Sequence, residues 1–254
     1  MYEARIIAPI RFSEWVSNLV PTRKKTGEIR LCVDTRNLNK VSLEDHYPLP
    51  KMDHILQRVV GASRISLLDG FSGFNQILVH HDDQDKIAFT TPWGKFKYVK
   101  MPFRLKNAGE TFQRAMDIAF AKEIHDFLVI YLDDLISFSK SDHQHLEHLR
   151  QVFFNCRKYG ISMNPKKSLF GLEEGKLLGH IISKDGIRID PGIIQANLQV
   201  PHPRNIKDIQ DFLGKINFLR RFIPNLAELI RLLNNMLKKD SKVKWTIEAK
   251  QAFE

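Results

Sequence analysis

The sequence predicts a mixed α+β fold, with antiparallel hairpins in the first two thirds of the chain and an all-helical tail. Short β-rich runs alternate with turn residues such as Pro92-Trp93-Gly94. Two strongly apolar runs flank Asp133-Asp134 as a tight hairpin. Beyond residue 205, apolar residues recur every three or four positions, as on a helix face. The 254 residues, 43% hydrophobic and 27% charged, are typical of a globular protein and exclude a disordered chain.

Several segments have the spacing of apolar residues that is typical of helices. They cover residues 49–60, 107–121, 142–159, 206–219 and 246–254. Asn107 and Glu110 have the spacing of a capping box at the start of the second of these helices. Gly160 is expected to end the third, because glycine readily adopts the left-handed conformation that follows many helices.

Runs of β-branched and aromatic residues predict the strands. They cover residues 64–68, 74–80, 86–91, 95–101, 127–132, 135–139, 176–183 and 187–190. The hairpin that turns at Asp133-Asp134 joins the fifth and sixth runs, and a second hairpin turns at Lys184-Asp185-Gly186 between the last two. No repeat or low-complexity segment interrupts this order.

The formal charge of +10 is unevenly distributed along the chain. Residues 23–40 carry six basic and two acidic residues (net +4), residues 41–93 carry four and seven (net −3), and residues 201–254 carry eleven and six (net +5). The pattern has two interpretations. Either the basic residues form solvated faces that need no partner, or two basic walls flank an acidic centre. The second arrangement would suit nucleic acid held beside a cation site.

Other features narrow the class of protein. No apolar run approaches the ~20 residues needed to span a bilayer, and the first residues lack the order of a signal peptide, so we expect an intracellular protein without a membrane partner. Cys32 and Cys156 cannot build a disulfide framework and are expected to be small buried apolar residues. His143, His145 and His148 lack metal-ligand spacing and are interpreted as a solvated helix face.

Three aspartates stand out because each adjoins an apolar strand. Asp69 ends the run 65–69, and Asp133 and Asp134 lie at a hairpin tip. Adjacent carboxylates repel each other, and their desolvation is costly unless a cation neutralises them. One interpretation is a solvent-exposed turn. The other is a two-metal site, since two divalent ions about 3.5–4 Å apart need carboxylate oxygens from several strands.

These residues belong to a series of motifs that resembles one known family. Tyr131-Leu-Asp-Asp134 resembles the YxDD motif of reverse transcriptases, and 68–77 resembles their first catalytic block. Further matches are 20–25 with 29–39 (fingers), 101–114 (the block that usually reads MPFGLKNAxATFQR), 177–183 (primer grip) and 211–224 (connecting region). In this order, over nearly the whole chain, they resemble the reverse transcriptase domain of gypsy-class long-terminal-repeat retrotransposon polyproteins.

The resemblance implies a right-hand polymerase fold of fingers, palm and thumb, with an antiparallel palm sheet and a helical C-terminal connection. Residues 1–63 would form the N-terminal part of the fingers, and 64–160 the palm with a fingers insertion around 80–107. Residues 161–200 would complete the palm and start the thumb, including the primer-grip hairpin. Residues 201–254 would form thumb and connection helices. The sequence carries no match to ribonuclease H, integrase or protease, so we expect a polyprotein fragment or a decayed copy.

The implied activity is RNA-directed DNA polymerisation, in which a primer 3′-hydroxyl attacks a deoxynucleoside triphosphate on an RNA or DNA template. Two Mg²⁺ ions, or Mn²⁺, would be held by Asp69, Asp133, Asp134 and the backbone carbonyl of Gly70. The compartment would be the cytoplasm, in a virus-like particle, or the nucleus. Self-association is left open.

By the same resemblance, Lys24 and Arg30 would hold the triphosphate, which suits their charge. Phe74 would exclude a ribose 2′-hydroxyl by steric contact, although an isolated Phe in such a pattern is more often a core residue. Phe103 would line the nucleotide pocket. The primer grip would be the pair Leu178 and Gly179, where glycine permits close approach of a backbone.

One departure from the family pattern bears on activity. Arg104 stands where the family has a glycine, and a glycine there indicates a positive φ or a close backbone approach. We therefore expect strain of about 1–3 kcal/mol or occlusion of the nucleotide site. The alternative to an active polymerase is a catalytically inactive relic that at most binds nucleic acid. A third interpretation, a viral RNA-dependent RNA polymerase, conflicts with Phe74 and the helical tail.

Overall fold

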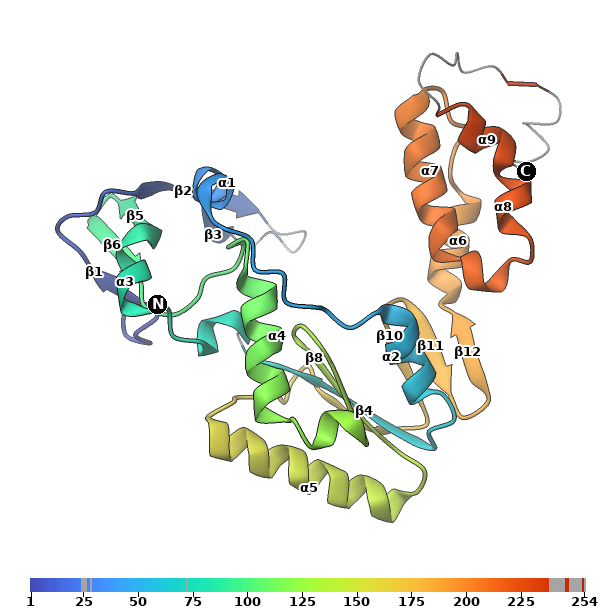
Figure 1. Ribbon diagram of the computed structural model, residues 1–254, viewed down its shortest axis with the longest axis horizontal. Coiled ribbons are helices and arrows are strands. Elements are labelled where there is room, and N and C mark those ends of the chain that lie inside the picture. The colour runs from blue at the N-terminus through green and yellow to red at the C-terminus, as the bar shows by residue number, and fades with distance from the viewer. Residues whose placement is uncertain (24–26, 28, 72, 238–244, 247–252, 254) are drawn as a thin grey trace. The chain divides into compact units, whose positions relative to one another are not determined.

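A computed structural model describes residues 1–23, 27, 29–71, 73–237, 245, 246 and 253, with the backbone alone at 30 and 31. The chain divides into two compact units (Figure 1). The first contains Met1–Gly175 and Ile182–Gly186, and the second contains Lys176–Ile181 and Ile187–Glu254. In the described residues, no helix is both long enough and apolar enough to cross a membrane.

The first unit contains a five-stranded sheet with the order β1-β6-β5-β2-β3. Its strands are β1 (Ile7–Pro9), β6 (Gly94–Tyr98), β5 (Ala88–Thr91), β2 (Val16–Arg23) and β3 (Ile29–Val33). Strands β2 and β5 are parallel, and the other pairs are antiparallel. Short helices α1 (Arg36–Val41), α3 (His81–Gln84) and η2 (Asp85–Ile87) adjoin this sheet. Its buried core is formed by Val33, Leu38, Ile87, Phe89 and Tyr98.

The same unit contains a four-stranded antiparallel sheet with the order β7-β8-β4-β9. The strands are β7 (Leu128–Tyr131), β8 (Asp134–Ser139), β4 (Arg64–Asp69) and β9 (Leu169–Leu172). Helices α4 (Ala108–Ala119) and α5 (Asp142–Tyr159) cover one face, as Figure 1 shows. Alternate strand residues face this layer: Leu68, Leu128, Ile130 and Leu135 pack with Phe112, Phe120 and Val152 in one buried core. Helix α2 (Met52–Val59) contacts β7 and lays Arg58 over the ring of Phe138.

The second unit is mainly helical. Its helices are α6 (Pro191–Leu198), α7 (Ile206–Phe218), η4 (Arg220–Phe222), α8 (Leu226–Leu229) and α9 (Arg231–Asn235). Ile209, Phe212, Leu213, Leu233 and Met236 form its buried core. A three-stranded sheet has the order β10-β11-β12; its strands are Glu174–Leu177, His180–Ser183 and Gly186–Ile189.

Most predicted elements are confirmed with shifts of a few residues at their ends, but the run 74–80 is not a strand. Gly73–Gln76 forms a 3₁₀ helix, η1, and only an isolated bridge joins Leu78 to Lys100. The side chain of Gln76 donates to the carbonyl of Ser162 and accepts from its backbone N–H at 2.6 Å. The side-chain amide of Gln76 thus pairs with the backbone of a distant segment in place of a strand partner, which local apolar alternation cannot reveal.

Two further predictions about helix ends and strands need correction. Asn107 precedes α4 but makes no capping bond, because its side chain donates to the carbonyl of Leu43 and accepts from the N–H of Asp45. The run 176–183 is two strands, since Leu178 and Gly179 both have positive φ and turn the chain between β10 and β11. Gly160 ends α5 in the left-handed conformation, as predicted. The predicted helix 246–254 lies mostly outside the described residues.

The prediction of a solvated histidine face on α5 is wrong for His145. Its side chain is buried, with Nε2 lying 2.7 Å from Ser66 Oγ and Nδ1 lying 2.9 Å from Ser139 Oγ. His148 adds a 2.7 Å contact to the same Ser139 hydroxyl and stacks on Phe127. We call Ser66, Ser139, His145 and His148 the serine–histidine cluster. His143 is exposed, as predicted, and both cysteines are buried, as expected.

Candidate active site

The structure brings Asp69, Asp133 and Asp134 together at one end of the four-stranded sheet, and we call them the aspartate cluster. Asp69 ends β4 and lies directly opposite Asp134, which begins β8. Asp134 also pairs with Tyr131, so that Leu132 and Asp133 form the turn between β7 and β8. Like charges directly opposite on paired strands are destabilising, so this end of the sheet is held in an unfavourable electrostatic state.

Asp133 is the least satisfied member of the cluster. Its Oδ1 is buried and has no hydrogen-bond partner among the described residues. A Cβ at Gly73 would collide with this oxygen, so the glycine at the start of η1 leaves the space that Asp133 occupies. Burial, followed by the charges of Asp134 and Asp69, raises the pKa of Asp133, while Lys167 opposes the rise. The pKa of Asp134 is also raised, by burial and then by Asp69.

Residues 164–168 hold Asp69 from the other side. The N–H of Asp69 donates to Ser168 Oγ at 3.1 Å, and its carbonyl accepts from the N–H of Asn164 at 2.8 Å. Lys167 Nζ lies 3.7 Å from Asp69 Oδ2, although its side chain is largely exposed. An exposed pair at this distance contributes little stability and leaves most of the carboxylate charge uncompensated.

The backbone around Gly70 links these parts. Its N–H donates to the carbonyl of Asp133 at 3.3 Å, and its own carbonyl, a predicted metal ligand, accepts from the N–H of Gly73 at 3.4 Å. This long bond leaves the carbonyl able to accept elsewhere. Among the described residues, no three His, Cys, Asp or Glu side chains are already arranged to hold a metal ion. Mg²⁺ sites of polymerases are completed by substrate phosphates and water rather than by a full protein cage, so the donor set still fits such an ion.

Gln113 on α4 supports the turn that carries Asp133 and was not predicted as a site residue. Its side chain is buried; Oε1 accepts from the N–H of Leu132 at 2.9 Å, and Nε2 donates to the carbonyl of Ile130 and to Asp117. Leu132 has φ +52°, a conformation that leucine rarely adopts. The amide of Gln113 thus helps to hold the strained turn that positions Asp133. Two sequence signals pointed to it: Gln113 lies in the family block 101–114, and it is a polar residue beside the apolar stripe of α4.

Two predicted nucleotide-site residues lie in contact. The rings of Phe74 and Phe103 meet edge to face with centroids 5.2 Å apart, and Phe74 also contacts Phe112 at 5.4 Å. Phe112 is a core residue, so one side of Phe74 is anchored in the core. Phe103 is about half exposed, with 51% of its surface accessible. Phe74 therefore combines the core and the site interpretations, because it packs inward and belongs to the 3₁₀ helix η1, whose first residue, Gly73, lies against Asp133.

Arg104 has the positive φ that its glycine position predicts. Its φ is +74°, and its carbonyl accepts hydrogen bonds from Thr35 Oγ1 at 2.9 Å and Asn39 Nδ2 at 2.7 Å. These two bonds hold the backbone in a conformation that costs an L-residue about 1–2 kcal/mol. The side chain is exposed, and its charge contributes to the lowered pKa of Asp34, after the larger effects of Arg36.

Of the four remaining predicted residues, two have side chains outside the described residues and two belong to the second unit. Lys24 lies outside the described residues, and Arg30 lies on β3 with its backbone opposite Thr22, its side chain again outside them. Leu178 and Gly179 belong to the second unit. A Cβ at Gly179 would lie 2.7 Å from the ring of Phe218 and 2.9 Å from Ile193, so this turn requires glycine for its φ of +78° and for space.

Comparisons with known proteins identify the family of the chain. The family described as reverse transcriptase (RNA-dependent DNA polymerase) matches residues 22–182. The Retrovirus-related Pol polyprotein from transposon 297 of Drosophila melanogaster is 34% identical over 97% of this chain and 23% of its own length. The Transposon Tf2-3 polyprotein of Schizosaccharomyces pombe is 35% identical over 91% of this chain and 17% of its own. The chain thus spans about a fifth of these relatives.

Solved structures show the same fold. The foamy viral protease-reverse transcriptase dRH in complex with double-stranded DNA matches 99% of this chain and 44% of that one, with a TM-score of 0.89 and 24% identity. The foamy viral protease-reverse transcriptase in complex with RNA/DNA hybrid matches 98% and 33%, with a TM-score of 0.81. The predicted α+β polymerase fold is confirmed. By its sequence match and its fold, the chain belongs to the reverse transcriptase (RNA-dependent DNA polymerase) family, and its relatives are transposon polyproteins.

Proposed function

We propose that this chain is the polymerase portion of a gypsy-class retrotransposon polyprotein and extends a DNA primer on an RNA or DNA template. The observation that carries the proposal is the aspartate cluster. Asp69 and Asp134 are paired across β4 and β8, and Asp133 presents a buried, unpartnered oxygen beside them. Such a concentration of unsatisfied like charge is retained in a protein where a cation compensates it.

Divalent cations, Mg²⁺ or Mn²⁺, would supply activation of the primer hydroxyl and charge neutralisation at the phosphates. The protein's own part is positional. Asp69, Asp133 and Asp134, with the Gly70 carbonyl, would hold the ions, and Gln113 would hold the turn that carries Asp133. Phosphoryl transfer needs no covalent protein intermediate, so the fixed placement of these oxygens is the main catalytic contribution.

The remaining predicted residues would bind the other reactants. Lys24 and Arg30 would pair with the triphosphate, Phe103 would line the nucleotide pocket, and Phe74 would exclude a ribose 2′-hydroxyl. A ring anchored on Phe112 is suited to steric exclusion, because it cannot move aside cheaply. Leu178 and Gly179 would contact the primer end. The activity would operate inside the cell, in a cytoplasmic particle or in the nucleus.

Primer extension tests the proposal. The wild-type chain is incubated with poly(rA)/oligo(dT), dTTP and Mg²⁺, in parallel with Asp133→Asn and with Asp185→Asn, an exposed turn residue, as the matched control. We expect extension by the wild type and the control, and a loss of about 10³-fold in Asp133→Asn. Activity that survives Asp133→Asn would exclude the assignment of the cluster to catalysis.

Arg104 favours a second candidate function, that of an inactive chain that at most binds nucleic acid. Its φ of +74° stores strain beside Phe103. If the wild type is inert and Arg104→Gly extends the primer, this candidate is correct and the defect is local. If both are inert while the wild type still binds a labelled RNA/DNA hybrid, binding is the remaining function.

A further inference from the structure

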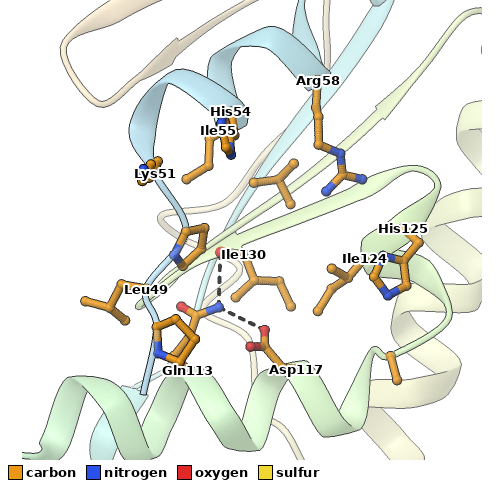
Figure 2. A pocket seen from close by; sticks show the side chains of 14 residues that line it. Leu49, Lys51, His54, Ile55, Arg58, Gln113, Asp117, Ile124, His125 and Ile130 are labelled. Atoms are coloured by element: carbon orange, nitrogen blue, oxygen red, sulfur yellow. Dashed lines mark hydrogen bonds between the residues drawn. The ribbon is translucent and has the colours of Figure 1, made fainter. Parts of the chain in front are cut away.

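A pocket of about 500 Å³ in the first unit is lined by none of the three aspartates, although Gln113, which supports the aspartate turn, forms part of its wall. It lies along β7, the edge strand of the four-stranded sheet, between helices α2 and α4 (Figure 2). Much of its wall is apolar, formed by residues such as Leu49, Ile55, Ile124 and Ile130. Its volume lies in the range of pockets that bind small molecules, about 300–1,000 Å³.

One charged side chain of the lining has a nitrogen without a hydrogen-bond partner among the described residues. Nη2 of Arg58 is buried and forms no hydrogen bond with any described residue. The guanidinium stacks over the ring of Phe138, with its carbon 5.8 Å from the centroid, and Figure 2 shows it reaching from α2 toward the side where Ile124 and His125 lie. The charge of Asp126 acts on Arg58 without a hydrogen bond to it. A buried donor left unpaired is energetically unfavourable, so this nitrogen is available to bind an acceptor.

The other polar groups of the pocket determine the charge of the ligand. Lys51, His54 and His125 are exposed at its rim and make the entrance basic or neutral. Asp117 is the acidic group of the lining, and both of its oxygens already accept hydrogen bonds, from Gln113 Nε2 and Tyr47 Oη. An anionic group is therefore attracted to Arg58, and a singly charged carboxylate costs less to desolvate in this largely apolar pocket than a doubly charged phosphate.

We propose that this pocket binds a small molecule that has a flat apolar body and one carboxylate, with Arg58 pairing with the carboxylate and the wall of Ile55, Ile124 and Ile130 burying the body. Arginine binds planar carboxylates through parallel N–H groups, which matches the donor that is free here. The inference goes beyond the proposed function and does not depend on it, since binding needs neither nucleic acid nor a metal ion.

The proposal is tested by isothermal titration calorimetry of the chain with 2-naphthoate, in the absence of nucleotide, nucleic acid and divalent ions. The neutral isostere 2-naphthalenemethanol is titrated in parallel. Two variants probe the site: Arg58→Gln removes the charge, and Ala121→Trp fills the pocket from an exposed position. Arg11→Gln is the matched control, because Arg11 also stacks on a phenylalanine ring but lies in an exposed segment. Thermal melting establishes that each variant is folded.

We expect one-to-one binding of 2-naphthoate that weakens about tenfold in Arg58→Gln and for the neutral isostere, since a charge-assisted hydrogen bond contributes that much. Ala121→Trp should abolish binding, and Arg11→Gln should leave it unchanged. Absence of binding to the wild type would overturn the proposal and indicate that water satisfies Arg58. Equal binding of the two probes, or unchanged binding in Arg58→Gln, would overturn the role of Arg58.

Discussion

Strands β4 and β8 carry two polar clusters that differ in how far their polar atoms are satisfied. In the serine–histidine cluster, both ring nitrogens of the buried His145 contact serine hydroxyls, and Ser66 Oγ also accepts from the N–H of Gly171. In the aspartate cluster, three carboxylates lie together and Asp133 Oδ1 has no described partner. The same two strands thus hold a neutral, satisfied network and a charged, unsatisfied one.

This difference in hydrogen-bond satisfaction distinguishes a cluster that stabilises the fold from one that is suited to binding a ligand. A buried network whose hydrogen bonds are all formed stabilises the native state and leaves no unpaired donor or acceptor for a ligand. An unsatisfied group of like charges costs free energy in the isolated protein, and that cost is recovered when a cation binds. Burial of polar groups by itself therefore does not identify a site, whereas several like charges gathered around a buried, unpartnered carboxylate oxygen indicate a place for a cation.

The largest expected loss of stability is at Gln113, the residue that joins α4 to the turn carrying Asp133. Gln113→Leu leaves the N–H of Leu132 and the carbonyl of Ile130 without the partner they have now. We expect the free energy of unfolding in urea to fall by about 3 kcal/mol and primer extension by at least about tenfold. Gln151→Leu, an exposed change on α5, is the control. Unchanged stability of the Gln113→Leu chain would show that the turn at Leu132 and Asp133 keeps its conformation without the hydrogen bonds of Gln113.

The second-largest expected loss of stability tests the serine–histidine cluster. His145→Leu has similar volume but leaves the Ser66 and Ser139 hydroxyls without the imidazole, so we expect a loss of about 2 kcal/mol in the free energy of unfolding. His143→Leu, on the exposed face of the same helix, should change it by less than about 0.5 kcal/mol. Equal effects of the two changes would remove the distinction between the clusters.

A smaller change in stability, this time a gain, is expected at Arg104. Arg104→Gly relieves the positive φ, and the hydrogen bonds to its carbonyl do not involve the side chain. The free energy of unfolding should rise by about 1 kcal/mol, because glycine adopts this φ without steric cost. Arg36→Gly is a suitable contrast, since Arg36 begins α1 and glycine in a helix is unfavourable. A loss of stability in Arg104→Gly would mean that the side chain contributes more than the strain costs.

The smallest expected effect is on how the free energy of unfolding depends on pH. The aspartate cluster and the serine–histidine cluster should contribute to this dependence with opposite signs. The pKa of Asp133 is raised above 3.8, so the native state holds its proton more tightly and stability from this group increases as pH falls toward 3.8. The pKa of His145 is lowered below 6.5, mainly by burial, so the unfolded state binds the proton more tightly and stability is lost as pH falls through 6.5.

Urea unfolding between pH 8 and 4 of the wild type, Asp133→Asn and His145→Leu separates the two contributions. The advantage of Asp133→Asn over the wild type should be greatest near pH 8 and shrink toward pH 4. The deficit of His145→Leu should instead shrink as the pH falls below 6.5. Parallel curves for all three proteins would show that neither group is coupled to folding.

The parts of the fold that follow from local pattern were predictable. Helix α5 was recognised from its apolar spacing and Gly160, and the β7–β8 hairpin from two apolar runs around Asp133-Asp134. The positive φ at Arg104 followed from a glycine position in the family motif. The strand expected at 74–80 was wrong because Gln76 bonds to Ser162, 86 residues away. No local window contains that partner.

The sequence by itself determined the family, the order of the elements and the three candidate aspartates. Each of these can be recognised from residue types that lie close together in the chain. Only the tertiary structure decided which polar groups are satisfied. His145 was expected in solvent and lies against Ser66, Gln113 supports Leu132 from another element, and Arg58 is left with a free nitrogen beside a pocket. A hydrogen bond requires two groups at about 3 Å, and residues distant in the chain are brought to that distance only by packing.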